Sequence, residues 1–252
     1  MIDLHSHILP GIDDGARTLA ESIGIAEAAV RDGLSTLAAP PHVRDDYPTA
    51  VETMKRLLGE LHETLASRAI ELKVVGGAEI AITALGRLTE NDLHRFALAG
   101  NPRYLLLEFP YFGWPLSLEV EIGRLDVLGI TVVLAHPERN PEVQRDTARL
   151  APAVSAGALV QLTAASVDGR LGSRARGTSF ELIESGLAHL VASDAHSPDV
   201  RAIGLSKAVE AIGDPSLANW LVEEVPRAIV DDGPIPPRPP AHGKTRRRWG
   251  RR

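Results

Sequence analysis

Histidine and carboxylate side chains recur in this chain of 252 residues, each just past a short apolar run. Near the start, His5-Ser6-His7 places two imidazoles at positions i and i+2, which point to the same side of an extended chain. Asp194-Ala195-His196 repeats this spacing with a carboxylate and an imidazole. One such pair is a common surface feature. Two pairs, after the first and last apolar runs, predict a shared metal site.

The full set of candidate ligands holds nine side chains: His5, His7, Asp14, His42, Glu79, Glu108, His136, Asp194 and His196. Because one ion takes about four to six ligands, the set implies two or three ions. Imidazole and carboxylate ligands without thiolate favour Mn²⁺, Fe²⁺ or Zn²⁺ over Ca²⁺ and Mg²⁺. The alternative is a rim of buried histidine–carboxylate hydrogen bonds, which without cations would leave many charges uncompensated.

The charge of such a site points to an anionic substrate. Four carboxylates contribute −4 and three divalent ions would contribute +6, so the loaded site is near +2. Arg139 and Arg201 are expected beside it, although surface ion pairs are the other interpretation of both. A phosphate ester fits this charge best, attacked in line by a water that the ions activate. The chain has no cysteine, which excludes a thiolate nucleophile and disulfides.

The elements that would position these side chains form a repeating pattern. A helical stretch ends in Gly, an apolar run follows, and a polar cluster closes it. The pattern predicts seven buried parallel strands, at 2–4, 34–39, 72–75, 103–107, 130–135, 158–162 and 187–192. Thr18, Thr49 and Thr178 each precede a Glu by three residues, the form of a capping box, and predict three helix starts.

Strands that alternate with helices predict an α/β protein with a parallel sheet, either closed as a barrel or open and doubly wound. The polar clusters follow at least five different strands, always at the C-terminal end. A barrel brings all these ends to one rim, whereas an open sheet gathers them at one switch point. We therefore expect a distorted, seven-stranded TIM-like barrel over residues 1–232.

Residues 233–252 differ from the rest of the chain. They are rich in Pro and Arg and carry a charge of +7. Because the whole chain has a net charge of −6, residues 1–232 carry −13. This composition predicts a disordered basic tail, and the acidic body excludes a nucleic-acid-binding role. We find neither a signal peptide nor an apolar run long enough to span a membrane, and we expect a cytoplasmic protein.

Five segments together resemble one known family. They are Met1–Gly15, Gly77–Ile80, Arg103–Phe109, Ala135–Arg139 and Ala192–His196. In this order they resemble the polymerase and histidinol phosphatase (PHP) superfamily, and within it the bacterial manganese-dependent protein-tyrosine phosphatases of capsule and exopolysaccharide operons. The resemblance implies the PHP barrel and a three-metal site, with Mn²⁺ first and Fe²⁺, Zn²⁺ or Co²⁺ as alternatives.

The resemblance also implies a role for each candidate residue. Three ligand sets are implied: His5, His7, Glu79 and Asp194 at one ion; Glu79, Glu108 and His136 at a second; Asp14, His42 and His196 at a third. Arg139 and Arg201 match the arginines that hold the phosphate. For the general acid, Asp199 and a metal-bound water stay open as alternatives.

An aromatic segment, Phe109–Pro115, directly follows Glu108. At a barrel mouth, Tyr111 and Trp114 would stack on the phenyl ring of a substrate, or they would simply cover the core under a helix.

The sequence therefore predicts a metal-dependent protein-tyrosine phosphatase. The expected partner is a phosphotyrosine protein, namely a membrane-associated tyrosine kinase that controls capsule or exopolysaccharide synthesis. The near alternative is a histidinol-phosphate phosphatase or another small phosphomonoesterase. A non-catalytic metal-binding or docking module is the alternative of a different class. The basic tail would add weak contact with anionic lipid, or would only keep the protein in solution.

Overall fold

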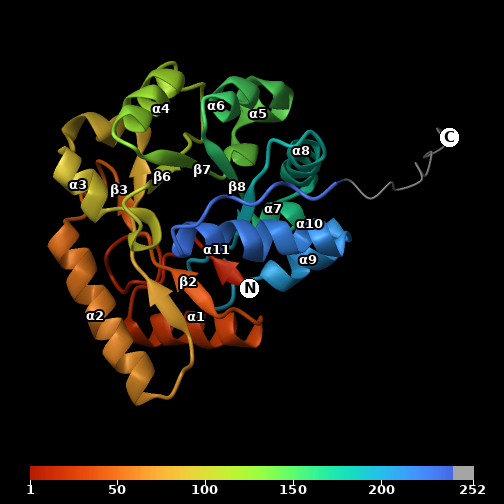
Figure 1. The fold of residues 1–252 in the computed structure, drawn as a ribbon. Coiled ribbons are helices and arrows are strands. Elements are labelled where there is room, and N and C mark those ends of the chain that lie inside the picture. The colour runs from red at the N-terminus through yellow and green to blue at the C-terminus, as the bar shows by residue number, and fades with distance from the viewer. Residues whose placement is uncertain (241–252) are drawn as a thin grey trace.

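Short parallel strands form the centre of the protein in a computed structural model that describes residues 1–240 (Figure 1). The strands are β1 (Ile2–Asp3), β2 (Thr36–Ala38), β3 (His42–Val43), β4 (Lys73–Val75), β5 (Glu79–Ala81), β6 (Tyr104–Glu108), β7 (Thr131–Ala135), β8 (Leu159–Thr163) and β9 (Leu190–Ala192). Each of the seven predicted strands overlaps an observed strand, and β6 and β8 end one residue later than predicted. The two additional ones, β3 and β5, directly continue the paths of β2 and β4.

The strands pair in the order of a barrel. One sheet runs β1-β2-β4 and a second runs β3-β5-β6-β7-β8-β9, with every pair parallel. The first and last strands meet through a parallel bridge between Ser6 and Ala195. β2 and β3 form one broken strand, and β4 and β5 form another. Counted in this way, seven strands are hydrogen-bonded in sequence around the barrel. The predicted distorted seven-stranded barrel is confirmed.

The two breaks in the barrel wall have local causes. Pro40 and Pro41 separate β2 from β3, and neither has an N–H to donate to a neighbouring strand. Gly77 lies between β4 and β5 with φ +152°, and a Cβ atom there would lie 3.1 Å from the Cα of Leu98. Both breaks place a candidate ligand, His42 or Glu79, at the start of the resumed strand.

Helices surround the strands (Figure 1). The α-helices are α1 (Leu19–Arg31), α2 (Val51–Ser67), α3 (Glu90–Arg95), α4 (Leu118–Val127), α5 (Pro141–Arg145), α6 (Ala151–Ser155), α7 (Ala164–Val167), α8 (Ser173–Glu184), α9 (Leu205–Ile212), α10 (Pro215–Asn219) and α11 (Val225–Val230). The 3₁₀-helices are η1 (Ile82–Arg87), η2 (Leu98–Gly100), η3 (Pro137–Arg139) and η4 (Thr147–Leu150). The element η5 (Trp220–Glu224) is a π-helix. Among residues 1–240, none of these helices combines the length and the apolar character that crossing a bilayer requires.

Only one of the three predicted capping boxes starts a helix. The Thr18 hydroxyl accepts a hydrogen bond from the backbone of Glu21 and caps α1, as predicted. The prediction at Thr49 is wrong, because α2 begins later, after Ala50, with no side-chain cap. The prediction at Thr178 is also wrong: α8 already begins at Ser173, and the Thr178 hydroxyl bonds to the carbonyl one turn earlier.

The first part of the predicted disordered tail packs on the barrel instead. The Trp220 indole donates a hydrogen bond to the carbonyl of Pro236 at 3.0 Å, and the Arg238 guanidinium lies over the Trp220 ring. Arg238 also donates to the carbonyl of Ile183, at 2.5 Å. Residues 233–240 therefore have defined contacts, and residues 241–252 of the predicted tail lie outside the described residues.

His189 should make the protein sensitive to acid. Burial, with a smaller contribution from Arg238, lowers its pKa to about 4, and its Nδ1 accepts a hydrogen bond from the backbone of Val160. Because the unfolded chain binds a proton near pH 6.5 and the folded chain does not, stability is lost as the pH falls from 6.5 towards 4. This group alone accounts for at most about 3 kcal/mol.

We expect His189→Asn to reduce that loss, because the Asn oxygen replaces the Nδ1 acceptor and does not titrate. The measurement is the melting temperature of both proteins at pH 7 and pH 5. An equal drop in the two proteins would show that His189 does not contribute.

Candidate metal centre

The structure brings all nine candidate ligands to one end of the barrel. Seven of them lie at or after the C-terminal end of a strand: His5, His7 and Asp14 after β1, Glu108 at the end of β6, His136 after β7, and Asp194 and His196 after β9. The other two, His42 and Glu79, begin β3 and β5, the short strands that resume β2 and β4 beyond the breaks. Their ligand atoms form four overlapping groups in which the atoms lie within 4.8 Å of one another. All but Asp14 are buried. Residues up to 191 positions apart thus share one site.

The innermost group has the spacing of a coordination shell. Nε2 of His5 and Nε2 of His7 are 3.2 Å apart, and each lies 3.3–3.4 Å from Oε2 of Glu79. Oδ1 of Asp194 lies 3.6 Å from His5 Nε2 and 3.4 Å from His7 Nε2. Ligands about 2.1 Å from an ion at tetrahedral angles are about 3.4 Å apart. The two imidazole nitrogens therefore have the separation from each other, and from each carboxylate oxygen, that an ion between them requires.

Glu79 stands between two groups of ligands. Its Oε1 lies 2.8 Å from Nε2 of His136, and its Oε2 lies 2.9 Å from Nδ1 of His42. Glu108 approaches the same place, with its Oε2 3.9 Å from His42 Nδ1. One carboxylate thus faces histidines on several sides, which is the arrangement of a bridging ligand. Glu108 groups with His42 and Glu79 rather than with His136, so the division of ligands among ions stays a prediction.

Asp14 organises the outermost group. Its Oδ1 lies 3.3 Å from Nε2 of His42 and 3.3 Å from Nε2 of His196. The ring of His7 lies against the ring of His196, with the centroids 4.0 Å apart. Because Asp14 is the most exposed of the nine, this group faces the mouth of the barrel.

The buried polar atoms at the centre fit divalent cations. Within residues 1–240, Glu79 Oε2, His42 Nδ1 and His196 Nε2 are buried yet have no aligned hydrogen-bond partner. Leaving such atoms unpaired costs about 1–3 kcal/mol each. A metal ion satisfies a carboxylate oxygen and an imidazole nitrogen together, without the alignment that a hydrogen bond requires.

The carboxylates at the centre are held ionised. Burial opposes ionisation of Glu79, but the neighbouring His5, His136 and His42 hold its pKa well below the ordinary value. Burial likewise opposes ionisation of Asp194, but His7 and His5 hold the pKa of that carboxyl well below its usual range. Glu108 differs, because burial and the nearby Glu79 raise its pKa. Cations would remove this repulsion between Glu79 and Glu108.

Two buried partners orient the first pair of histidines. Asp13 lies 2.7 Å from Nδ1 of His7, and Gln161 lies 2.8 Å from Nδ1 of His5. Because each partner contacts Nδ1, the other ring nitrogen, Nε2, points to the centre. Histidines that bind a metal are commonly oriented in this way, by a residue that does not itself contact the metal. Neither residue was assigned a role from the sequence. The signal for Gln161 was its amide within an otherwise apolar strand.

Two candidate ligands have backbone conformations that residues other than glycine rarely adopt. His136 has φ +40° and Asp194 has φ +53°, both in the left-handed region. Each backbone N–H donates to a carbonyl of the neighbouring strand or its extension, from His136 to Gln161 and from Asp194 to His5. Strain of this kind is found at functional sites where the surrounding structure compensates for it.

The two predicted arginines meet at one oxygen. Arg139 donates to Oδ2 of Asp194 at 2.7 Å, and Arg201 donates to the same atom at 3.0 Å. They are therefore ion-paired at the edge of the metal centre rather than scattered on the surface. Arg44, which the sequence analysis did not single out, donates to Glu108 at 3.0 Å. Asp199, one alternative for the general acid, accepts a hydrogen bond from the backbone of Val200 in the loop before Arg201.

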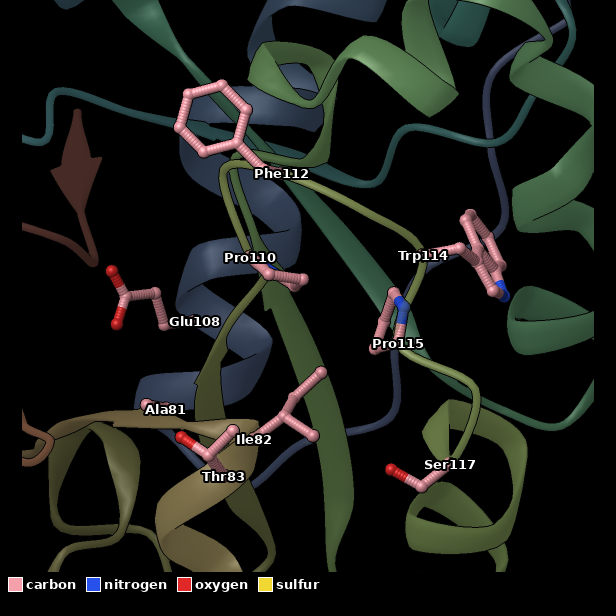
Figure 2. Close-up of a pocket in the computed structure, with 9 residues that line it drawn as sticks. All are labelled: Ala81, Ile82, Thr83, Glu108, Pro110, Phe112, Trp114, Pro115 and Ser117. Atoms are coloured by element: carbon pink, nitrogen blue, oxygen red, sulfur yellow. The ribbon is translucent and has the colours of Figure 1, made fainter.

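The two predicted aromatic residues lie in different surroundings. The Tyr111 ring stacks on the His136 ring, with the ring centroids 5.6 Å apart. The Arg139 guanidinium also lies over the Tyr111 ring, 4.8 Å from its centroid. Burial raises the pKa of Tyr111 to about 12. Trp114 packs edge-on against Phe109 and under Arg149, while it also lines a cavity beside Glu108 (Figure 2).

Barrel and site together define a class of protein: a (β/α) barrel whose rim carries a candidate centre for several divalent ions. Comparison with known proteins gives the family. Residues 1–219 match the family model described as capsular polysaccharide synthesis, CpsB/CapC, and the chain belongs to this family.

Two curated relatives are similar over most of their length. The chain is 34% identical to the tyrosine-protein phosphatase YwqE of Bacillus subtilis, over 99% of each chain. It is also 34% identical to the putative tyrosine-protein phosphatase CapC of Staphylococcus aureus, over 78% of this chain and 77% of that one.

A solved structure has the same fold. It comes from a study of YwqE from Bacillus subtilis and CpsB from Streptococcus pneumoniae, described there as unique metal-dependent tyrosine phosphatases. It matches with a TM-score of 0.86 and 33% identity, over 95% of this chain and 99% of the other.

Proposed function

We propose that this protein is a metal-dependent tyrosine-protein phosphatase that hydrolyses phosphotyrosine in a protein substrate. The observation that carries the proposal is the convergence of nine imidazole and carboxylate side chains, with two arginines beside them, at one rim of the barrel. The activity named for the relatives of this chain supports it.

The proposed ligands are the nine predicted residues: His5, His7, Asp14, His42, Glu79, Glu108, His136, Asp194 and His196. Mn²⁺ is the proposed ion, and Fe²⁺, Zn²⁺ and Co²⁺ suit the same imidazole–carboxylate set. When bound, divalent ions supply an activated water and neutralise negative charge on the phosphoryl group.

Arg139 and Arg201 are proposed to bind the oxygens of the phosphoryl group. Both guanidinium groups already converge on Asp194 Oδ2, so they are positioned for an anion at this edge of the centre. Guanidinium groups hold phosphoryl oxygens with charge-assisted hydrogen bonds, which strengthen as charge develops in the transition state. No protein nucleophile is needed, in agreement with the absence of cysteine.

The proposed partner is a phosphotyrosine protein in capsule or exopolysaccharide synthesis, namely a membrane-associated tyrosine kinase. This assignment rests on the family of the chain and on the predicted cytoplasmic location.

The six basic residues within 241–252 would bring the enzyme to anionic lipid. Sedimentation with anionic liposomes tests this: a chain that ends at residue 240 should bind less than the full chain, and equal binding would contradict the lipid contact.

The experiment that tests the proposed function compares two substrates. The Mn²⁺-loaded protein should release phosphate from a phosphotyrosine peptide much faster than from histidinol phosphate, and a chelator should stop the reaction. Faster hydrolysis of histidinol phosphate would instead favour a small-molecule phosphatase. Bound Mn²⁺ with no hydrolysis of any phosphomonoester would favour a non-catalytic module.

Tyr111 is expected to contact the phenyl ring of the substrate. Its own ring is held beside the candidate metal centre by His136 and Arg139, which lie against its faces, so a substrate phenyl ring would pack on it edge-to-face. We expect Tyr111→Ala to raise KM for a phosphotyrosine peptide about threefold to tenfold, with little change for a small alkyl phosphate. Trp114→Ala tests the second aromatic residue in the same way. Equal effects on both substrates would exclude packing on the substrate ring.

A further inference from the structure

Helix α4 buries one apolar face in the core and exposes further apolar side chains on the opposite side, where Arg124 lies between Val120 and Val127 in the sequence. Leu118, Ile122 and Leu125 are buried. On the other face, Val120 and Val127 are 71% and 85% exposed, and they lie seven residues apart on one side of the helix. Leu116, one turn before Val120, is 91% exposed.

Phe112 continues this apolar surface towards the metal centre. Its side chain is 83% exposed, at the tip of the loop that joins β6 to α4. We name these four side chains the α4 apolar surface: Phe112, Leu116, Val120 and Val127. Large apolar side chains exposed along one loop and the helix that follows it are candidates for a surface that binds another molecule.

A cavity of about 350 Å³ is lined by Phe112, one residue of the α4 apolar surface, and by Glu108 of the candidate metal centre (Figure 2). Ile82 lines one side, and Pro110, Phe112, Trp114 and Pro115 line the other. Glu108, one of the nine candidate ligands, forms part of the wall. Figure 2 shows the Glu108 carboxylate on one side of the view and Trp114 on the other. The apolar side chains that line the cavity therefore lie next to a candidate ligand.

The loop that carries Phe112 is held in place. The amide of Asn140, itself buried, donates to the carbonyl of Pro110 at 2.6 Å and to that of Gly113 at 2.8 Å. Asn140 directly follows Arg139, a proposed phosphate-binding residue. The exposed Phe112 is thus presented by a rigid turn that is tied to the catalytic rim.

We propose that this cavity and the α4 apolar surface bind the polypeptide that carries the phosphotyrosine, and accept apolar side chains next to it in the substrate sequence. This inference rests on the proposed function, because the occupant must enter from the metal centre. Apart from Glu108, the side chains lining the cavity carry no charge, which suits apolar residues better than acidic ones. A second copy of this chain seated on Phe112 would obstruct the cavity beside Glu108, so we favour the substrate.

The test uses the full chain with Mn²⁺ and two phosphotyrosine peptides, one with Leu on both sides of the phosphotyrosine and one with Ser. We expect the Leu peptide to have a KM about tenfold lower with the natural protein. The double variant Phe112→Ser, Val120→Ser should lose this preference, while KM for p-nitrophenyl phosphate changes less than twofold. Val30→Ser, on the far helix α1 and 41% exposed, is the matched control and should keep the preference.

Each other outcome overturns the inference. Equal KM values for the two peptides with the natural protein mean that apolar flanks are not recognised. A preference that survives the double variant places recognition elsewhere. If light scattering shows that the variant loses a dimer while the preference is unchanged, the surface joins two copies. Failure of the proposed function is distinct, because the natural protein would then hydrolyse neither peptide.

Discussion

Replacing Glu79 with Gln should lower kcat/KM for phosphotyrosine by at least a factor on the order of 10³. The two oxygens of Glu79 face His136 on one side and His42, His5 and His7 on the other, so its carboxylate lies within 3.4 Å of four candidate ligands. Gln has the same shape but cannot supply a negative charge to two ions. Loss of several kcal/mol of electrostatic stabilisation corresponds to a rate change of this size.

Metal content measured alongside the kinetics gives this prediction a second readout. We expect Glu79→Gln to bind fewer ions per chain than the natural protein at the same Mn²⁺ concentration. Glu138→Gln is the matched control. Glu138 is equally buried and follows the ligand His136 by two positions, but its Oε1 is held by the backbone of Thr163 and the hydroxyl of Ser166. The control should keep its metal; unchanged activity and metal content in Glu79→Gln would contradict a bridging role.

The barrel was predictable because most strands are buried on both faces and at least five of the predicted ones end at a polar cluster. Runs such as Ile130–Ala135 followed by His136 identify both the strand and the side chain at its end. Parallel strands in a barrel present all their C-terminal ends at one rim, so the order of elements was sufficient to predict convergence. The sequence did not predict that β2 and β4 resume after their breaks, because β3 and β5 form by pairing with each other, through residues distant in the chain such as Pro41 and Glu79.

The contacts between side chains were less predictable than the site itself. Asp13 and Gln161 support His7 and His5, but a carboxylate in a loop and an amide in a strand have many possible partners. The pairing of Arg44 with Glu108 depends on how β3 lies beside β5 and β6. The cap at Thr49 failed for a related reason, since the packing of α2 decides which residue begins the helix.

Removing metal should lower the melting temperature by on the order of 10–20 °C. An ion present at about 100 times its dissociation constant stabilises the folded state by about 2.7 kcal/mol, and two or three ions would act together. For a chain of this size, 1 kcal/mol corresponds to roughly 2–4 °C. The structural reason is the concentration of buried carboxylates: burial and Glu79 already raise the pKa of Glu108, so cations relieve repulsion that the folded protein otherwise retains.

Chelation followed by return of Mn²⁺ separates this effect from damage to the fold. The melting temperature and the phosphatase activity should fall together in chelator and recover together with Mn²⁺. In Glu79→Gln the chelator should cause a much smaller shift, because fewer ions are there to be removed. Elemental analysis verifies that the protein is free of metal. If it then melts at the same temperature as the loaded protein, histidine–carboxylate hydrogen bonds alone stabilise the rim. The unpaired buried atoms of His42 and His196 argue against that outcome.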